Sequence, residues 1–122
     1  MSPIGDIIWA RRPVDFDPRA LAFIRGQPTS IRRQIGEALR DLQKGAYLGM
    51  PMSRPMATVA AGVHELRVRG EGTQIRVLYC VRYLDRIIVF HAFQKKSQKT
   101  PLREIRLARH RLQEVLDEAI EC

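Results

Sequence analysis

The sequence predicts an α+β fold, in which a small antiparallel sheet has two N-terminal helices and a C-terminal helix packed on it. The chain has 122 residues, enough for one hydrophobic core. Strand-like and helix-like patterns follow one another in the order strand, two helices, three strands, helix. The three late strands are joined by connections short enough only for antiparallel hairpins. We therefore expect residues 1–122 to form a single domain, with the helices covering one face of the sheet.

The N-terminal part of the chain predicts one strand and one short helix. Residues 6–11 (DIIWAR) are a brief β-prone apolar run, which we expect to be the first strand. Asp17 followed by Pro18 combines a capping side chain with a proline in the first turn, and this pair opens a helix that runs to about Arg25. Gly26 then interrupts the helix.

A longer helix and a loop come next. Thr29 or Ser30 can cap this helix. Apolar side chains at three- and four-residue spacing predict its buried stripe, which comprises Ile31, Ile35, Ala38, Leu39 and Leu42. Gly45 suits the position just past the helix end. Residues 49–62 contain two prolines, three methionines and little periodicity, so we expect a loop there.

The remaining chain predicts a three-stranded meander and a final helix. The strands cover residues 63–69, 74–83 and 86–95. Thr100 and Pro101 repeat the combination of cap and proline, and they open the last helix. Its apolar side comprises Ile105, Ala108, Leu112, Val115, Leu116 and Ala119.

The charge of the chain favours a polyanionic partner. Twenty-one basic and 13 acidic residues give a formal net charge of +8. The densest excess lies in residues 62–99, where eight basic and three acidic residues give 8 − 3 = +5. This balance indicates nucleic acid or the ribosome rather than a membrane, because no lipid-facing segment is present. A run of charge is also compatible with an ordinary solvated surface.

Other classes of function find little support in the sequence. The two cysteines, Cys80 and Cys122, form no CxxC motif, and no histidines stand at ligand spacing. We therefore expect no metal site, no disulfide framework and no cofactor. No phosphate-cradling glycine loop or nucleophile motif supports a small-molecule enzyme. The N-terminus lacks the pattern of an export signal, so we expect a cytoplasmic protein.

Strand alternation gathers the polar, chemistry-bearing residues on one face of the sheet. Leu66, Val68, Ile75 and Val77 fall on the face that the helices should cover. The other face is expected to be open, and it carries Glu65, Arg67, Arg69, Arg76, His91, Phe93 and Lys95, with Lys96 and Lys99 at its rim. Basic groups bind phosphates, and an aromatic ring can stack on a base. His91 and Phe93 could equally be core residues, because the strand that carries them is apolar on both faces.

Three segments of the sequence resemble a known family. They are Glu65-Leu66-Arg67, the strand Ile75-Arg76-Val77-Leu78-Tyr79, and residues 92–101 (AFQKKSQKTP). Over nearly its whole length the chain resembles the RelE/HigB superfamily of bacterial toxins, and more closely its phage-derived, HigB-like branch. The resemblance implies the toxin of a type II toxin–antitoxin system. Such toxins are ribosome-dependent mRNA endoribonucleases, neutralised by an antitoxin that often carries a helix-turn-helix DNA-binding domain.

The resemblance also nominates catalytic residues. The two strand arginines and the lysine that follows "HAF" correspond to Arg67, Arg76 and Lys95. Metal-independent RNA cleavage uses the ribose 2′-hydroxyl as nucleophile on the adjacent phosphate, and these cations would stabilise the charge that grows there. By residue type, Glu65 or His91 could transfer protons, and so could Lys95 if its cationic neighbours lower its pKa. The C-terminus, EAIEC, lacks the histidine or tyrosine that some relatives carry there.

The remaining residues of the expected open face are assigned to RNA binding. They are Arg69, Phe93, Lys96 and Lys99. The alternative interpretation is a non-catalytic basic module of the same fold, which binds RNA, DNA or a partner protein through the same face. Cleavage of mRNA by purified protein with translating ribosomes would separate the two interpretations.

Overall fold

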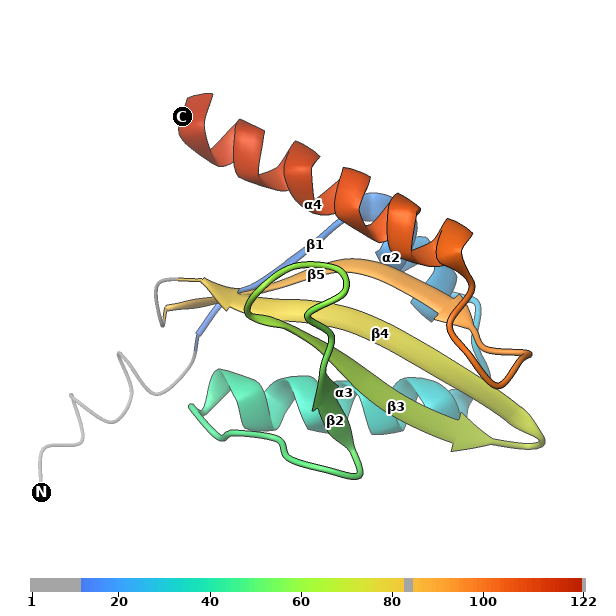
Figure 1. Ribbon diagram of the computed structural model, residues 1–122. Coiled ribbons are helices and arrows are strands. Elements are labelled where there is room, and N and C mark those ends of the chain that lie inside the picture. The colour runs from blue at the N-terminus through green and yellow to red at the C-terminus, as the bar shows by residue number, and fades with distance from the viewer. Residues whose placement is uncertain (1–11, 83–84, 122) are drawn as a thin grey trace, which may run out of the picture.

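A five-stranded sheet forms the centre of the molecule. In the computed structural model, which describes residues 12–82 and 85–121, the strands are β1 (Val14–Phe16), β2 (Ser53–Pro55), β3 (Val63–Gly70), β4 (Thr73–Arg82) and β5 (Arg86–Gln94). Their order across the sheet is β1-β5-β4-β3-β2 (Figure 1). Strand β1 runs parallel to β5, and the other neighbours are antiparallel. The predicted α+β class and the three-stranded meander are confirmed.

The two edge strands differ from the sequence expectation. Residues 49–62 were expected to be a loop, yet Ser53–Pro55 pairs with β3 and places Arg54 opposite Glu65. The strand predicted at residues 6–11 lies outside the described residues, and the observed strand β1 follows that segment. Each observed edge strand is only three residues long. A run this short is not revealed by alternation, and its pairing depends on the neighbouring strand.

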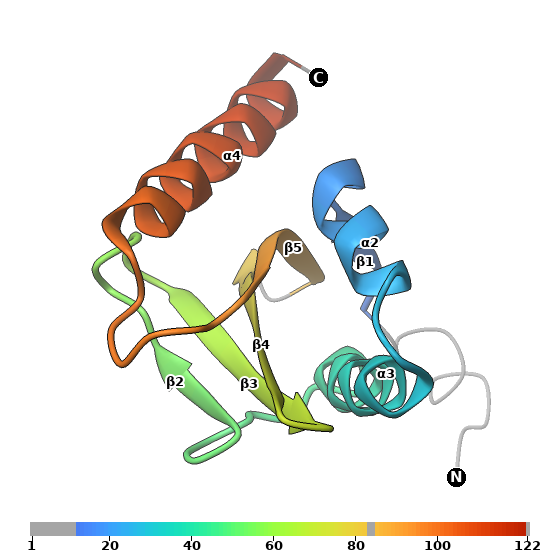
Figure 2. The same ribbon diagram turned by 90° about the vertical axis from the view of Figure 1, so that its right-hand side faces the viewer.

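Three helices pack on the two faces of the sheet: α2 (Pro18–Arg25), α3 (Thr29–Gln43) and α4 (Leu102–Glu121). Helices α2 and α3 cover one face, where their apolar side chains meet Leu66, Ile75 and Val77. Helix α4 covers the opposite face, where Ala108 and Leu112 meet Leu78, Ile88 and Phe90 (Figure 2). The expectation that all helices share one face is therefore wrong. Strand β5 is buried on both sides, so each of its faces needs a cover.

A bulge in β5 explains why its faces could not be read from alternation. Leu78 pairs with His91, whereas the next residue, Tyr79, pairs with Val89. Phe90 is therefore an extra residue in β5, and the inward and outward positions exchange there. Val89 belongs to the core under α2 and α3, while Phe90 belongs to the core under α4.

Several local predictions are confirmed. All five residues of the predicted α3 stripe are buried. Gly45 follows the helix with a φ of 95°, a conformation that suits glycine. The predicted short connection between β3 and β4 is a turn of two residues, Glu71 and Gly72, whose φ values of 53° and 76° match the right-handed twist of a tight hairpin.

The predicted helix caps have mixed outcomes. The Asp17 carboxylate accepts hydrogen bonds from the backbone N–H groups of Arg19 and Ala20, at 2.8 and 3.3 Å, so the cap of α2 is confirmed. Helix α3 begins at Thr29 with no side-chain cap, so the predicted capping role of Thr29 or Ser30 is wrong.

The cap predicted for the last helix is also absent. Helix α4 begins at Leu102, and its first turn is closed by the Pro101 carbonyl, which accepts from the N–H groups of Glu104 and Ile105. The Thr100 hydroxyl is buried and has no hydrogen-bond partner among the described residues. Thr100 therefore lies one position too early to serve as the cap.

Candidate nucleic-acid interface

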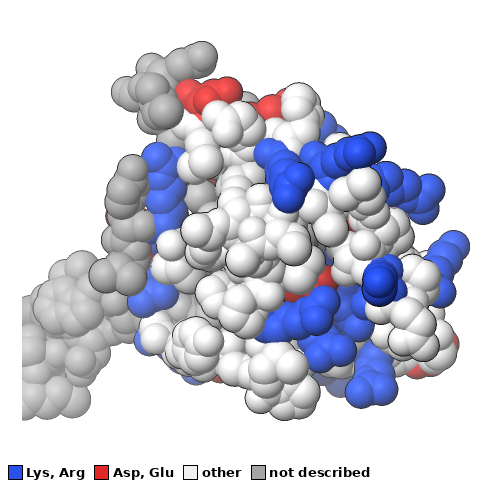
Figure 3. Space-filling model, viewed as in Figure 1, with Lys and Arg blue, Asp and Glu red and all other residues white. Residues whose placement is uncertain are grey.

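A polar pocket of about 700 Å³ lies where the β3–β4 hairpin meets the segment that leaves β5. Basic side chains gather on this side of the molecule (Figure 3). The lining residues are Arg67, Gly72, Gln74, Arg76, Gln94, Lys95, Lys96, Ser97 and Gln98. We call this the basic pocket. It unites the three positions expected to be catalytic, because Arg67 pairs with Arg76 across β3 and β4, and Lys95 follows the end of β5.

Arg76 is the most buried cation of the basic pocket, with a side chain that is 5% exposed. Its Nη2 donates to the side-chain oxygen of Gln74 at 3.0 Å, and its Nη1 donates to the Ile75 carbonyl at 3.3 Å. Its Nε lies 3.6 Å from Glu65 Oε1. Burial lowers the pKa of Arg76, and the negative charge of Glu65 opposes this shift. Arginine nevertheless keeps its proton in proteins, so the pocket contains a fixed positive charge.

Lys95 is half-buried and anchored at both ends. Its backbone N–H donates to the Gln74 carbonyl at 2.8 Å, which continues the pairing of β5 with β4. Its Nζ donates to the Gln98 carbonyl at 2.8 Å. Burial, followed by the positive charge of Arg76, lowers the pKa of Lys95. A lysine with a lowered pKa can give and take a proton more readily near neutral pH.

The other basic residues are spread around the basic pocket. Arg67 and Lys96 line it, and Arg69 is exposed further along β3. Lys99 lies outside it and lines an adjoining hollow of about 440 Å³ together with Arg54. Sequence reasoning missed Arg54, because residues 49–62 were expected to be loop. No period-two pattern in that segment could have indicated its place beside Glu65.

Three residues expected on the open face are covered instead. Glu65 and His91 are buried, and the Phe93 ring is buried among the core residues under α4. The predicted role of Phe93 in stacking on a base is therefore wrong in this structure, because no ring face is accessible. Neither Glu65 nor His91 lines the basic pocket. They share the predicted face of the sheet, but α4 and β2 close over that part of it.

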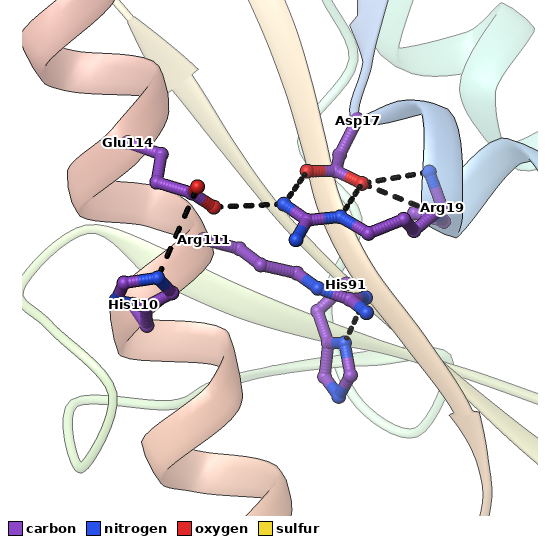
Figure 4. A network of polar contacts seen from close by, with 7 residues as sticks. Asp17, Arg19, His91, His110, Arg111 and Glu114 are labelled. Carbon is purple, nitrogen blue, oxygen red and sulfur yellow. Dashed lines mark hydrogen bonds and ion pairs between the residues drawn. The ribbon is translucent and has the colours of Figure 1, made fainter.

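His91 belongs to a polar network between β5 and α4. Its Nδ1 lies 2.8 Å from Arg111 Nη1 (Figure 4), and its Nε2 lies 2.8 Å from Glu104 Oε1. Because a guanidinium can only donate, Nδ1 must accept, and the proton of the neutral ring is on Nε2. The ring also stacks on Phe93, at 5.4 Å between centroids. The pKa of His91 is lowered, and burial is the largest cause of this shift. These contacts hold α4 on β5, and His91 does not line the basic pocket.

A second hollow, of about 880 Å³, lies elsewhere, beside β1, α2 and α4. Arg19 crosses it and pairs with Asp17 at 2.7 Å and with Glu114 at 2.8 Å (Figure 4). Arg86 pairs with Asp15 at 2.6 Å. These cations are already neutralised by carboxylates. Among the described residues, no carboxylate lies within 4 Å of Lys95 or Arg67 in the basic pocket. The smaller pocket is therefore the better anion site.

Residues 22–113 match the model of a family described as phage derived protein Gp49-like. The chain belongs to this Gp49-like family. The family is one of RelE-like toxins, so the resemblance to the phage-derived branch of the RelE/HigB superfamily is confirmed. Membership in a toxin–antitoxin family implies a cognate antitoxin as partner.

No curated protein matches the Gp49-like chain. Among solved structures it is similar to a mutant of the E. coli toxin RelE in the free state, with 19% identity and a TM-score of 0.43. The match covers 67% of this chain and 81% of the RelE chain. Within residues 12–82 and 85–121, no helix has both the length and the hydrophobicity needed to cross a membrane.

Proposed function

We propose that this Gp49-like chain is the toxin of a type II toxin–antitoxin system and cuts mRNA on the ribosome. The basic pocket carries this proposal, because it places Arg67, Arg76, Lys95 and Lys96 around one polar hollow. Four cations around a hollow suit a phosphodiester, whose negative charge increases as it reacts. Family membership supports the toxin class, and the expected site of action is the cytoplasm.

The proposed reaction is attack of the ribose 2′-hydroxyl on the adjacent phosphorus. A bond forms from the 2′-oxygen to phosphorus, and the bond from phosphorus to the 5′-oxygen breaks. The products are a 2′,3′-cyclic phosphate and a 5′-hydroxyl. Arg76 and Arg67 would hold the non-bridging oxygens, where charge accumulates. The base must take the 2′-hydroxyl proton, and the acid must supply one to the leaving 5′-oxygen.

Lys95 is the proposed proton-transfer residue of the basic pocket. Its lowered pKa and its position beside Arg76 favour this role. Glu65 and His91 are poorer candidates, because both are buried and lie outside the pocket lining. The ribosome would orient the mRNA, so a site with few acid–base groups could still act through positioning.

The proposed partner of the free toxin is an antitoxin that carries a helix-turn-helix domain. We expect an acidic or helical segment of that antitoxin to cover the basic pocket, because charge complementarity guides such contacts. A complex with the pocket fully exposed to the ribosome would require neutralisation by another route.

A non-catalytic RNA-binding module is the second candidate. The observation in its favour is the burial of Arg76, whose nitrogens already donate to Gln74 and Ile75. A group held in this way could bind a phosphate without contributing much to its reaction. Cleavage of mRNA therefore has to be measured directly.

The decisive experiment compares Lys95→Ala with wild type in cleavage of mRNA by purified protein with translating ribosomes. Loss of the proposed proton-transfer residue should reduce the rate about a hundred- to ten-thousandfold. Lys44→Ala is the matched control, because Lys44 is an exposed lysine at the end of α3. Full cleavage by the Lys95 variant would contradict its catalytic role. Wild type that binds ribosomes and never cleaves would support the binding module.

A further inference from the structure

Glu65 is a wholly buried carboxylate within the most basic part of the molecule. Its side chain is 0% exposed. The oxygen Oε1 lies 3.0 Å from Arg54 Nε and 3.6 Å from Arg76 Nε. The other oxygen, Oε2, is buried without a hydrogen-bond partner among the described residues. One carboxylate oxygen is therefore shared by two arginines.

The sheet register explains this arrangement. Arg54 of β2 is the direct cross-strand neighbour of Glu65. On the other side Arg76 of β4 lies diagonally, because Arg76 pairs with Arg67 two residues further along β3. Arg76 lines the basic pocket, and Arg54 lines the adjoining hollow that contains Lys99. Glu65 thus stands between the cations of two neighbouring hollows.

Stability alone does not account for Glu65. A buried ion pair gains little over apolar residues of similar size, because both charges lose their hydration. A carboxylate with one oxygen unpartnered loses still more. The arrangement also leaves the Nε of Arg76 without a hydrogen bond among the described residues. A role beyond stability is therefore needed to explain a charged residue here.

We propose that Glu65 is a positioning residue, which orients Arg76 toward the RNA phosphate from behind. This inference rests on the proposed function, since it assumes that RNA occupies the basic pocket. Arg76 stands among Arg54, Arg67 and Arg69, whose positive charges act against it. Glu65 supplies the compensating charge on the side away from the pocket. Without it, Arg76 gains by turning outward into water, and the phosphate loses a preorganised donor.

The test is Glu65→Gln, which keeps the shape of the side chain and removes its charge. We expect a fall in ribosome-dependent mRNA cleavage of tenfold or more, with little change in melting temperature. The matched control is Glu71→Gln, because Glu71 is an exposed glutamate in the turn beside the basic pocket. This control should cleave like wild type.

A double-mutant cycle distinguishes positioning from a general structural effect. On an Arg76→Ala background, Glu65→Gln should reduce cleavage no further, because the residue that it orients is gone. If the two losses of activity multiply, or if Glu65→Gln cleaves within twofold of wild type, the proposal is overturned.

A second readout is the pH profile of cleavage. The negative charge of Glu65 raises the pKa of Lys95 against burial and the neighbouring arginines. The limb of the profile that belongs to Lys95 should therefore move to lower pH in Glu65→Gln and stay in place in Glu71→Gln. An unmoved limb would count against the proposal. If neither Glu65→Gln nor Glu65→Asp folds, Glu65 serves the fold and the proposal is overturned.

Binding of a short single-stranded RNA, followed by fluorescence anisotropy, separates this inference from the proposed function. If wild type binds this RNA and does not cleave mRNA, the proposed function fails. If Glu65→Gln weakens RNA affinity when Arg76 is present but not on the Arg76→Ala background, the result would still support positioning. Equal affinity of wild type and Glu65→Gln would overturn it, whatever the cleavage result.

Discussion

Asp17 and Thr100 are both followed by proline, yet only Asp17 caps a helix. The Asp17 side chain is 4% exposed, accepts two backbone N–H groups, and pairs with Arg19. The Thr100 hydroxyl is buried without a partner among the described residues. The same combination of a capping residue and proline therefore has opposite energetic consequences. The helix begins at the proline after Asp17, but one residue beyond the proline after Thr100.

Substitution of these two residues should change stability in opposite directions. Asp17→Ala should lower the free energy of unfolding by roughly 1–2 kcal/mol through the lost cap. Thr100→Val, which replaces the unsatisfied hydroxyl by a methyl group, should raise it by up to about 1 kcal/mol. Urea denaturation of both variants measures the changes. A loss of stability in Thr100→Val would indicate that the hydroxyl has a partner in solution.

At the scale of elements, the docking of α4 on β5 depends on a neutral histidine. Arg111 donates to His91 Nδ1. A proton on Nδ1 would therefore place two donors, Arg111 Nη1 and His91 Nδ1, against each other. The groups that face His91 are Glu104 and Arg111 of α4 and Asp17 before α2, with Phe93 stacked on the ring. Burial is the largest cause of its lowered pKa.

The stability of the fold should therefore fall as the solution is acidified below about pH 6.5. In this range the unfolded chain binds a proton at His91 more readily than the folded chain. The stability contributed by neutral His91 is therefore present above its ordinary pKa and lost as pH falls through its folded pKa. In His91→Gln this loss between pH 6.5 and 5 should be smaller. Thermal melts across that range measure it. Equal slopes for both proteins would exclude His91 as the cause.

Asp17 does not confound the measurement. The hydrogen bond from Arg19 lowers its pKa below the ordinary 3.8, so its contribution is lost only at more acidic pH.

At the scale of the whole molecule, the net charge of +8 is focused by the fold. Cations from β3, β4 and the segment after β5 line one pocket. Elsewhere Arg19 and Arg86 are paired with carboxylates. Long-range electrostatic attraction should therefore guide RNA to the basic pocket.

Binding of single-stranded RNA should weaken steeply with salt. If Arg67, Arg76, Lys95 and Lys96 all contact phosphates, the slope of log K against log salt should be about −3, from roughly 0.7 per contact. Lys96→Ala should reduce the slope by about 0.7, and Lys44→Ala should leave it unchanged. Affinity titrations at several salt concentrations test this. A flat dependence would argue against the basic pocket as the contact surface.

The sequence by itself determined the local elements and the residues that share a face. The α3 stripe, the Asp17 cap and the short connection between β3 and β4 follow from periodicity and turn chemistry. Strand alternation places Arg67 and Arg76 on one face, and the family resemblance adds Lys95 to them. These features depend on neighbours within a few residues or on directly paired strands. They can therefore be predicted from short segments of the sequence.

Only the tertiary structure decided what covers each face. Alternation placed Glu65 on the same face as Arg76, and the cost of burying polar groups favoured the same face for His91 and Phe93. Neither argument could show that α4 and β2 close over them. The bulge at Phe90 and the three-residue edge strands likewise depend on distant partners. Burial is a property of the whole assembly of elements, so a residue's access to solvent, and with it a role in chemistry, is settled only when the helices are in place.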